Sequence, residues 1–225
     1  MSLPVNIHTH RFNSNTSAEV LSVDYQNFDA FLPSSLTDHQ FYSLAFHPMQ
    51  WSPNSSIDFL KVRELLAHKK CLAIGEAGLD KASSFSTKSQ LDLFRLLMPI
   101  SEETKLPIVI HCVGRWNELE VLFKERDVRA PEWIIHGFRK TKLANKFIDL
   151  DANLSFGKAL LTDETLQQCV AQLPIHRIFL ETDDADVDLM ALYEKLAELK
   201  SLSLPAIIEE LSHNFKRVFR YGKLA

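Results

Sequence analysis

Histidines and carboxylates follow several short apolar runs of this chain, and these residue types bind divalent metal ions in proteins. His8 and His10 lie two residues apart after the first run, so on a strand both imidazoles point to the same side. Later apolar runs end on further residues of this kind: Glu76, His111, His136, Glu181 and Asp183. One histidine in such a position is more often structural than metal-binding, but the repeated arrangement favours a metal site.

The set of residue types also indicates how many ions the site would hold. Imidazole and carboxylate ligands without thiolates suit Zn, Mn, Fe or Mg. His8-x-His10, Glu76, two later histidines and Asp183 offer too many ligands for one tetrahedral zinc. They suit two ions that share a bridging carboxylate. Glu76 is the natural bridge, because it lies between the first histidine pair and the later histidines along the chain.

Eight strand-like runs position these side chains. They centre near Ile7, Val20, Leu44, Ala73, Val109, Ile134, Leu154 and Phe179. From Ser55 onward the runs alternate with helix-like segments, which predicts a parallel α/β sheet closed into a (β/α)8 TIM barrel. Such barrels carry their active sites at the carboxyl ends of the strands, where the candidate ligands lie. Residues 1–225 are expected to form one domain. Only Arg11 to Ser17 separate the first two strands, so the barrel is shortened around its first crossover.

Helix boundaries follow from capping residues and proline. Ser55 and Asp58 fit a capping box that begins a helix. A second helix is expected over roughly 87–104, with a kink or a break at Pro99. Thr162 is expected to cap a later helix.

Composition bounds the class of protein. An apolar share of 46% with 24% charged residues is typical of a globular protein with a large core. The net charge of −4 argues against a protein that coats nucleic acid, so a phosphate-bearing substrate would need a local site. Cys71, Cys112 and Cys169 are widely spaced and are expected to be reduced. Neither a membrane span nor a signal peptide is visible, and we expect a cytoplasmic monomer without a membrane partner.

Five blocks of this sequence together resemble the TatD family of metal-dependent hydrolases. These enzymes belong to the amidohydrolase-like barrels, and characterised members are deoxyribonucleases. The resemblance extends over nearly the whole chain, includes His47-Pro48 after the third strand, and is carried by His8-Thr9-His10, Gly75 to Asp80, Pro107 to His111, His136-Gly137-Phe138 and Glu181-Thr182-Asp183.

The resemblance implies two divalent ions, Mg²⁺, Mn²⁺ or Zn²⁺. It assigns one ion to His8, His10 and Asp183 and the other to His111 and His136, with Glu76 shared between them. A pair of this kind generates hydroxide at neutral pH and stabilises charge on a phosphoryl group.

Catalytic roles are implied by the same likeness. Glu76 and Asp183 would be the catalytic carboxylates, with Asp183 orienting or deprotonating the attacking water. Glu181 would hydrogen-bond a ligand imidazole and set its tautomer. Water would then attack a phosphodiester in line.

Substrate contacts are expected in the loops after the strands. The candidates are His47, Trp51, Arg115, Arg139 and Lys140. Arg139 and Lys140 either hold a phosphate or simply begin a solvated helix.

The chain also departs from the family pattern. Asn6 stands where the family usually has aspartate. Asp184-Ala185-Asp186 replace a small residue followed by proline, and their carboxylates would repel a polyanion at the mouth of the site.

Three functions remain open on these residues. The leading one is a two-metal phosphodiesterase that acts on DNA ends or short oligonucleotides. A second is an amidohydrolase-like enzyme that cleaves a carbon–nitrogen or ester bond of a small molecule. A third is a catalytically inactive metal-binding barrel. Glu76 at the bridging position, in place of a lysine that could be carbamylated, favours the first, and the intact ligand set disfavours the third.

Overall fold

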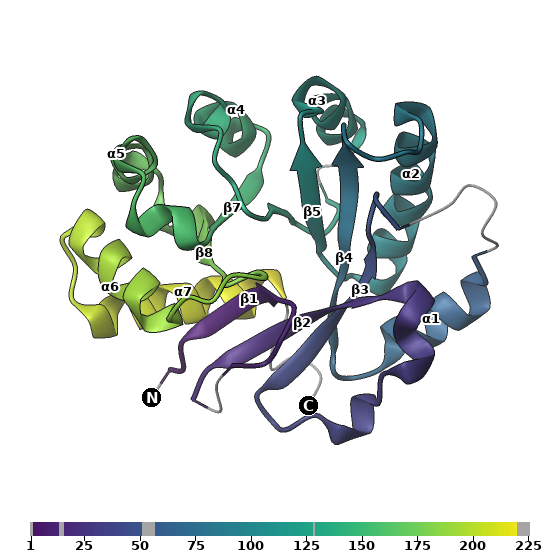
Figure 1. The fold of residues 1–225 in the computed structure, drawn as a ribbon, viewed down its shortest axis with the longest axis horizontal. Helices are drawn as coiled ribbons and strands as arrows, with labels where there is room; N and C mark the ends of the chain where they lie inside the picture. The colour runs from purple at the N-terminus through teal and green to yellow at the C-terminus, as the bar shows by residue number, and fades with distance from the viewer. Residues whose placement is uncertain (1, 14–15, 51–56, 128, 220–225) are drawn as a thin grey trace.

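The strands follow one another around a nearly closed barrel in chain order, and each neighbouring pair is parallel (Figure 1). The computed structural model describes residues 2–13, 16–50, 57–127 and 129–219. The strands are β1 (Val5–Thr9), β2 (Ala18–Asp24), β3 (Gln40–Phe46), β4 (Cys71–Asp80), β5 (Ile108–Val113), β6 (Trp133–Ile135), β7 (Ala152–Phe156) and β8 (Ile178–Leu180). Each contains one of the eight predicted centres, so the predicted barrel is confirmed.

The barrel closes between its first strand and the segment that follows its last. Thr9 and Asp183 form a parallel bridge. The amide of Asp183 donates to the carbonyl of His8 over 3.0 Å, and the amide of His10 donates to the carbonyl of Asp183 over 3.1 Å. Closure therefore brings Asp183 directly beside the first histidine pair.

Helices cover the outside of most of the strands (Figure 1). They are α1 (Phe59–Ala67), α2 (Thr87–Thr104), α3 (Trp116–Glu125), α4 (Ala144–Asp149), α5 (Glu164–Gln172), α6 (Leu189–Lys200) and α7 (Leu204–Val218). Short 3-10 helices are η1 (Tyr25–Ala30), η2 (Pro33–Ser35), η3 (Thr141–Leu143), η4 (Lys158–Leu161) and η5 (Ile175–Arg177). No described residue before Phe59 is in an α-helix, which agrees with the predicted shortening around the first crossover.

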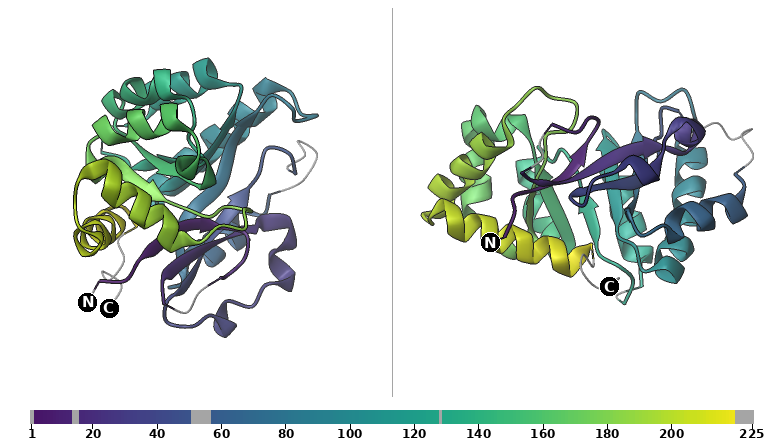
Figure 2. Two further views of the ribbon diagram at one scale, coloured as in Figure 1. Left: turned by 60° about the vertical axis from the view of Figure 1, so that its left-hand side comes forward. Right: turned by 90° about the horizontal axis from the view of Figure 1, so that it is seen from below.

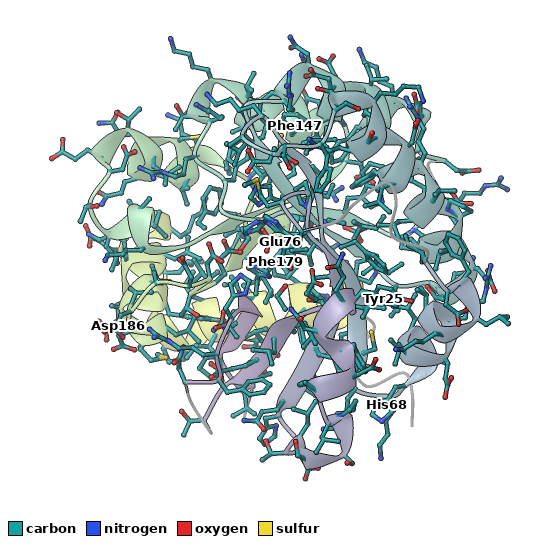
Figure 3. All side chains as sticks on the ribbon, turned by 45° about the vertical axis from the view of Figure 1, so that its right-hand side comes forward. Tyr25, His68, Glu76, Phe147, Phe179 and Asp186 are labelled. Atoms are coloured by element: carbon teal, nitrogen blue, oxygen red, sulfur yellow. The ribbon has the colours of Figure 1, made fainter. Side chains whose placement is uncertain are left out.

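The strands bury side chains on both faces. One cluster combines Ile7, Val20, Ala73, Val109, Ile134 and Phe179, each from a different strand, with side chains of α7. A larger cluster joins the alternate strand residues to the surrounding helices. Figure 3 labels Phe179 near the middle of the ring of strands, and Figure 2 shows α7 beside β1. Because the barrel interior is filled, a ligand must approach at one end of it.

One predicted helix cap is wrong, and the predicted helix over 87–104 is continuous. The cap of α5 is Asp163, whose carboxylate accepts from the amide of Leu166 over 3.0 Å, and Thr162 instead ends η4. Helix α2 runs through Pro99 without a break. Proline removes one helical hydrogen bond, but the neighbouring Leu97 and Ile100 are buried, and their packing holds the helix together.

The start of α1 agrees with the sequence in part. Asp58 is its cap and accepts from the amides of Leu60 and Lys61 over 2.9 and 3.1 Å. The other half of the predicted box, Ser55, lies outside the described residues. Within those residues, no helix combines the length and the apolar composition that crossing a membrane would require.

Candidate metal centre

The carboxylate of Glu76, which is labelled in Figure 3, is surrounded by imidazoles at the carboxyl end of the barrel. Its Oε1 atom lies 2.6 Å from His111 Nδ1, 2.8 Å from His136 Nε2 and 3.3 Å from His47 Nε2. Its Oε2 atom lies 3.6 Å from the Nε2 atoms of His8 and His10. The two oxygens therefore face two different groups of imidazoles, as a bridging carboxylate does.

Two glycines let β4 deliver Glu76 to this position. Gly75 and Gly78 have positive φ angles of 115° and 153°, and the register against β5 shifts between Ile74 and Ala77. A Cβ on Gly75 would lie 2.2 Å from the carbonyl oxygen of Val109. A Cβ on Gly78 would lie 2.0 Å from that of His111. Only glycine permits so close an approach of the two backbones.

Asp183 joins the same cluster from the far side of the barrel. Its Oδ1 atom lies 3.4 Å from His8 Nε2 and 3.3 Å from His10 Nε2. Its backbone is left-handed, with φ of 53°, a conformation that aspartate tolerates better than most residues. The two backbone bonds to β1 hold it there.

His111 is held between two carboxylates. While Nδ1 faces Glu76, Nε2 lies 2.9 Å from Asp80 Oδ2. The side chain of Gln90 holds Asp80, because it accepts from the Asp80 amide over 2.7 Å and donates to the Asp80 carbonyl over 3.1 Å. The sequence reasoning assigned no role to Asp80. The sequence feature that could have indicated a role for Asp80 is its position at the end of the Gly75 to Asp80 block, after Glu76 on the same strand.

Glu181 is fully buried beneath His136. Its Oε1 atom lies 3.4 Å from His136 Nδ1 and accepts from the amide of Gly137 over 2.6 Å. The structure thus brings Glu181 next to an imidazole of the cluster. Asn6, by contrast, binds Thr182, which donates its amide over 3.0 Å and accepts from the Asn6 amide group over 2.8 Å.

Charges within the cluster compensate one another. Burial opposes ionisation of Glu76, but the charge of His136 and hydrogen bonds from the imidazoles hold its pKa well below the usual range. The pKa of Asp183 is likewise lowered, against the effect of burial, by hydrogen bonds from His10 and His8. Hydrogen bonds to Asp183 and Glu76 raise the pKa of His10 to about 10. Without metal, protonated imidazoles therefore supply the positive charge that these carboxylates need.

The donor set fits divalent cations. Both ring nitrogens of His8 are buried without a hydrogen-bond partner, although Nε2 faces two carboxylates. Three groups have their donor atoms within 4.8 Å of one another: His8, His10 and Glu76; His8, His136 and Asp183; and His47, Glu76 and His111. A cation would complete the coordination of such an orphaned nitrogen.

These groups differ in part from the expected pairing of ligands. His47, expected to contact substrate, lies with Glu76 and His111. His136, expected to share an ion with His111, lies within reach of His8 and Asp183 as well.

The remaining expected substrate contacts are scattered. Arg115 pairs with Glu118 over 3.4 Å, and Trp51 lies outside the described residues. Arg139 and Lys140 are both exposed in the loop after β6. At the rim, Arg11 pairs with Asp186 over 3.3 Å.

Two cavities adjoin the cluster. The larger, of about 540 Å³, is called the β2–β3 pocket, and its outer wall includes Leu21, Val23, Asp24, Asn27, Phe31 and Gln50. The smaller, of about 200 Å³, is called the β6–β8 cleft and includes Arg139, Lys158 and Glu181. Asp183 and Asp184 line both.

Comparison with known families decides what kind of barrel this is. The model of the family described as TatD related DNase matches residues 6–220. The chain belongs to the TatD-related DNase family. The predicted resemblance is therefore confirmed, and the matched range includes every residue of the cluster.

Relatives of this TatD-family chain carry hydrolase names. An uncharacterized metal-dependent hydrolase of Bacillus subtilis, YabD, is 28% identical over 80% of this chain and 79% of its own. The 3′-5′ ssDNA/RNA exonuclease TatD of Musicola paradisiaca is 30% identical over 61% of this chain and 54% of its own. The crystal structure of the TatD homolog YJJV from Escherichia coli has a TM-score of 0.80 at 19% identity, covering 96% of this chain and 97% of its own. The chain is therefore of the metal-dependent hydrolase type, on the TatD barrel.

Proposed function

We propose that this protein is a two-metal phosphodiesterase that hydrolyses DNA ends or short oligonucleotides. The observation that carries the proposal is the position of Glu76, whose two carboxylate oxygens face separate groups of imidazoles. A bridging carboxylate of this kind is typical of sites that hold two divalent ions. The distant relative named an exonuclease on single-stranded DNA and RNA supports the substrate class.

Different residues of the cluster would bind each of the two ions. Glu76 would bind both, His8 and His10 would bind one with Asp183, and His111 and His136 would bind the other, with His47 in reach of Glu76 as a further donor. When bound, such ions lower the pKa of water and offset the negative charge of a phosphoryl group.

Asp183 has the position of a proton acceptor. Its carboxylate faces the cluster, lines both cavities and has a lowered pKa, so it is ionised at neutral pH. It would orient the attacking water and accept its proton as the new phosphorus–oxygen bond forms. The ester bond on the opposite side of phosphorus breaks, and the leaving oxygen takes up a proton to become an alcohol. The products are a phosphate monoester and a hydroxyl end.

The test is hydrolysis of bis-p-nitrophenyl phosphate and of single-stranded pentanucleotides after loading with Mg²⁺, Mn²⁺ or Zn²⁺. We expect activity that requires metal. It should fall by about a thousandfold in Asp183→Asn, which removes the proposed proton acceptor, and in Glu76→Gln, which removes the carboxylate proposed to hold both ions.

A panel of carboxylic esters and amides measured in parallel separates this function from the amidohydrolase-like one. Metal-dependent cleavage of those compounds without cleavage of either phosphodiester would overturn the proposal. Glu198→Gln serves as a matched control, because Glu198 pairs with Lys195 on the surface of α6.

A further inference from the structure

The two cavities that meet at Asp183 and Asp184 differ in charge. On one side of these residues the β2–β3 pocket extends over η1, and on the other the β6–β8 cleft lies between the loops that follow β6, β7 and β8. A substrate whose scissile group lies at the cluster would therefore extend into two different environments.

Beyond the cluster, the wall of the β2–β3 pocket is neutral to acidic. The cluster contributes imidazoles together with Glu76 and Asp183; among the other described lining residues, Asp24 and Asp184 carry carboxylates, and none is a lysine or an arginine. A phosphate monoester adds about −1.5 to −2 charges at neutral pH and gains nothing from such a wall.

The wall of the pocket suits an uncharged ring. Phe31 lines it, and the rings of Phe28 and Tyr42, each with its centroid 5.4 Å from that of Phe31, hold Phe31 in place. Bases stack on aromatic side chains of this kind. Asn27 and Gln50 add amide groups that donate and accept hydrogen bonds. The volume of about 540 Å³ lies within the range of pockets that bind small organic groups.

The β6–β8 cleft carries the cations that the pocket lacks. Arg139 and Lys158 line it and are exposed, and it lies against the same Asp183 and Asp184. Their charges favour the next phosphate of a chain on this side.

We propose that the β2–β3 pocket selects the end of the substrate: it accepts a terminal nucleoside with a free hydroxyl and rejects an end that carries a phosphate. The rest of the chain would leave through the β6–β8 cleft. This inference rests on the proposed phosphodiesterase function and adds a substrate requirement to it.

The test compares four pentanucleotides that carry a hydroxyl or a phosphate at the 3′ end and at the 5′ end, with metal-loaded protein. Phosphate at one of the two ends should lower kcat/KM by about tenfold or more, because like charges brought together in a site are strongly unfavourable. Phosphate at the other end should have little effect. Equal rates for all four, or cleavage at internal bonds first, would overturn the inference while leaving the phosphodiesterase intact.

A pair of variants on η1 locates the selection. Asp24→Asn keeps the acceptor that caps η1, which binds the amide of Gln26 over 2.8 Å, but removes the charge. The ratio of rates for hydroxyl and phosphate ends should fall severalfold. Asp29→Asn removes an exposed charge of the same 3-10 helix that pairs with Lys61 outside the pocket, and it should leave the ratio unchanged. An unchanged ratio in Asp24→Asn contradicts the assignment to this pocket.

Failure of the phosphodiesterase proposal would still leave this inference open to test. If no pentanucleotide is hydrolysed, the same four are stable ligands, and fluorescence anisotropy gives their dissociation constants. Weaker binding of one phosphorylated end supports the inference, and equal or absent binding of all four overturns it.

Discussion

Asp80 and Glu76 lie at opposite nitrogens of the His111 ring, because Asp80 Oδ2 is 2.9 Å from Nε2 and Glu76 Oε1 is 2.6 Å from Nδ1. A carboxylate behind a ligand imidazole fixes the proton on the nitrogen that faces it and leaves the other nitrogen free to bind metal. Asp80 is therefore a positioning residue for the proposed metal ligand His111.

Asp80→Asn should weaken metal binding by about tenfold to a hundredfold. The amide keeps the acceptor for the amide of Ala82, but its NH₂ group then faces Nε2 and favours a proton on Nδ1, the nitrogen needed for metal. Titration with Mn²⁺ or Zn²⁺ followed by calorimetry measures the change. Asp92→Asn, an exposed change on α2 that affects the pair with Lys88, is the control. Unaltered affinity in Asp80→Asn would show that Asp80 does not position His111.

Gly78→Ala should destabilise the protein much more than Gly137→Ala. Both positions have positive φ, which costs an L-residue about 1–2 kcal/mol. At Gly137 the nearest atom to an added Cβ is 3.7 Å away, whereas at Gly78 it is the carbonyl oxygen of His111 at 2.0 Å. Urea denaturation of the two variants measures the difference. Equal urea midpoints for the two variants would mean that β4 can move away from β5 without loss of stability.

The metal-free protein should lose stability as the pH rises. The pKa of His10 is raised from its ordinary 6.5 to about 10, so its contacts with Asp183 and Glu76 contribute fully below about pH 6.5 and are lost between there and pH 10. The fall in Tm of metal-free protein over this range should be smaller in His10→Gln. An equal fall of Tm with pH in the two proteins would contradict the raised pKa of His10.

Metal binding should release protons at neutral pH. Ligand imidazoles must be neutral, whereas the pKa values of His10 and His136 are raised above their ordinary value in the metal-free cluster. Calorimetric titrations in buffers with different ionisation enthalpies count the protons released. The number should fall as the starting pH rises toward 10, and a heat of binding that is independent of the buffer would argue against protonated imidazoles in the cluster.

Glu132→Gln should destabilise the barrel by about 1–3 kcal/mol without changing metal affinity. Glu132 directly precedes β6, at the end of the barrel opposite the cluster, and its carboxylate binds Arg177 over 3.1 Å and also contacts Arg217. That end of such barrels contributes to stability and not to the active site, so metal affinity should not change. Chemical denaturation and a metal titration test both parts. Weakened metal binding with unchanged stability would show that Glu132 acts on the metal site and not on the stability of the barrel.

The sequence by itself determined the eight strands, their parallel order and the side chains at their carboxyl ends. Apolar runs of β4 and β5 bury both faces of their strands, so the runs are long enough to recognise without any knowledge of their neighbours. Histidine and carboxylate at the ends of such runs stand out for the same local reason.

Only the tertiary structure decided how those side chains meet. His47 and His136 directly follow β3 and β6, which are not neighbours in the barrel, and their distances to Glu76 depend on the shift of β4 against β5 between Ile74 and Ala77. The bridge that brings Asp183 to β1 joins residues far apart in the chain. Strand direction follows from local pattern, but the approach of two strand ends depends on register, bulges and closure of the whole barrel, which no short stretch of sequence contains.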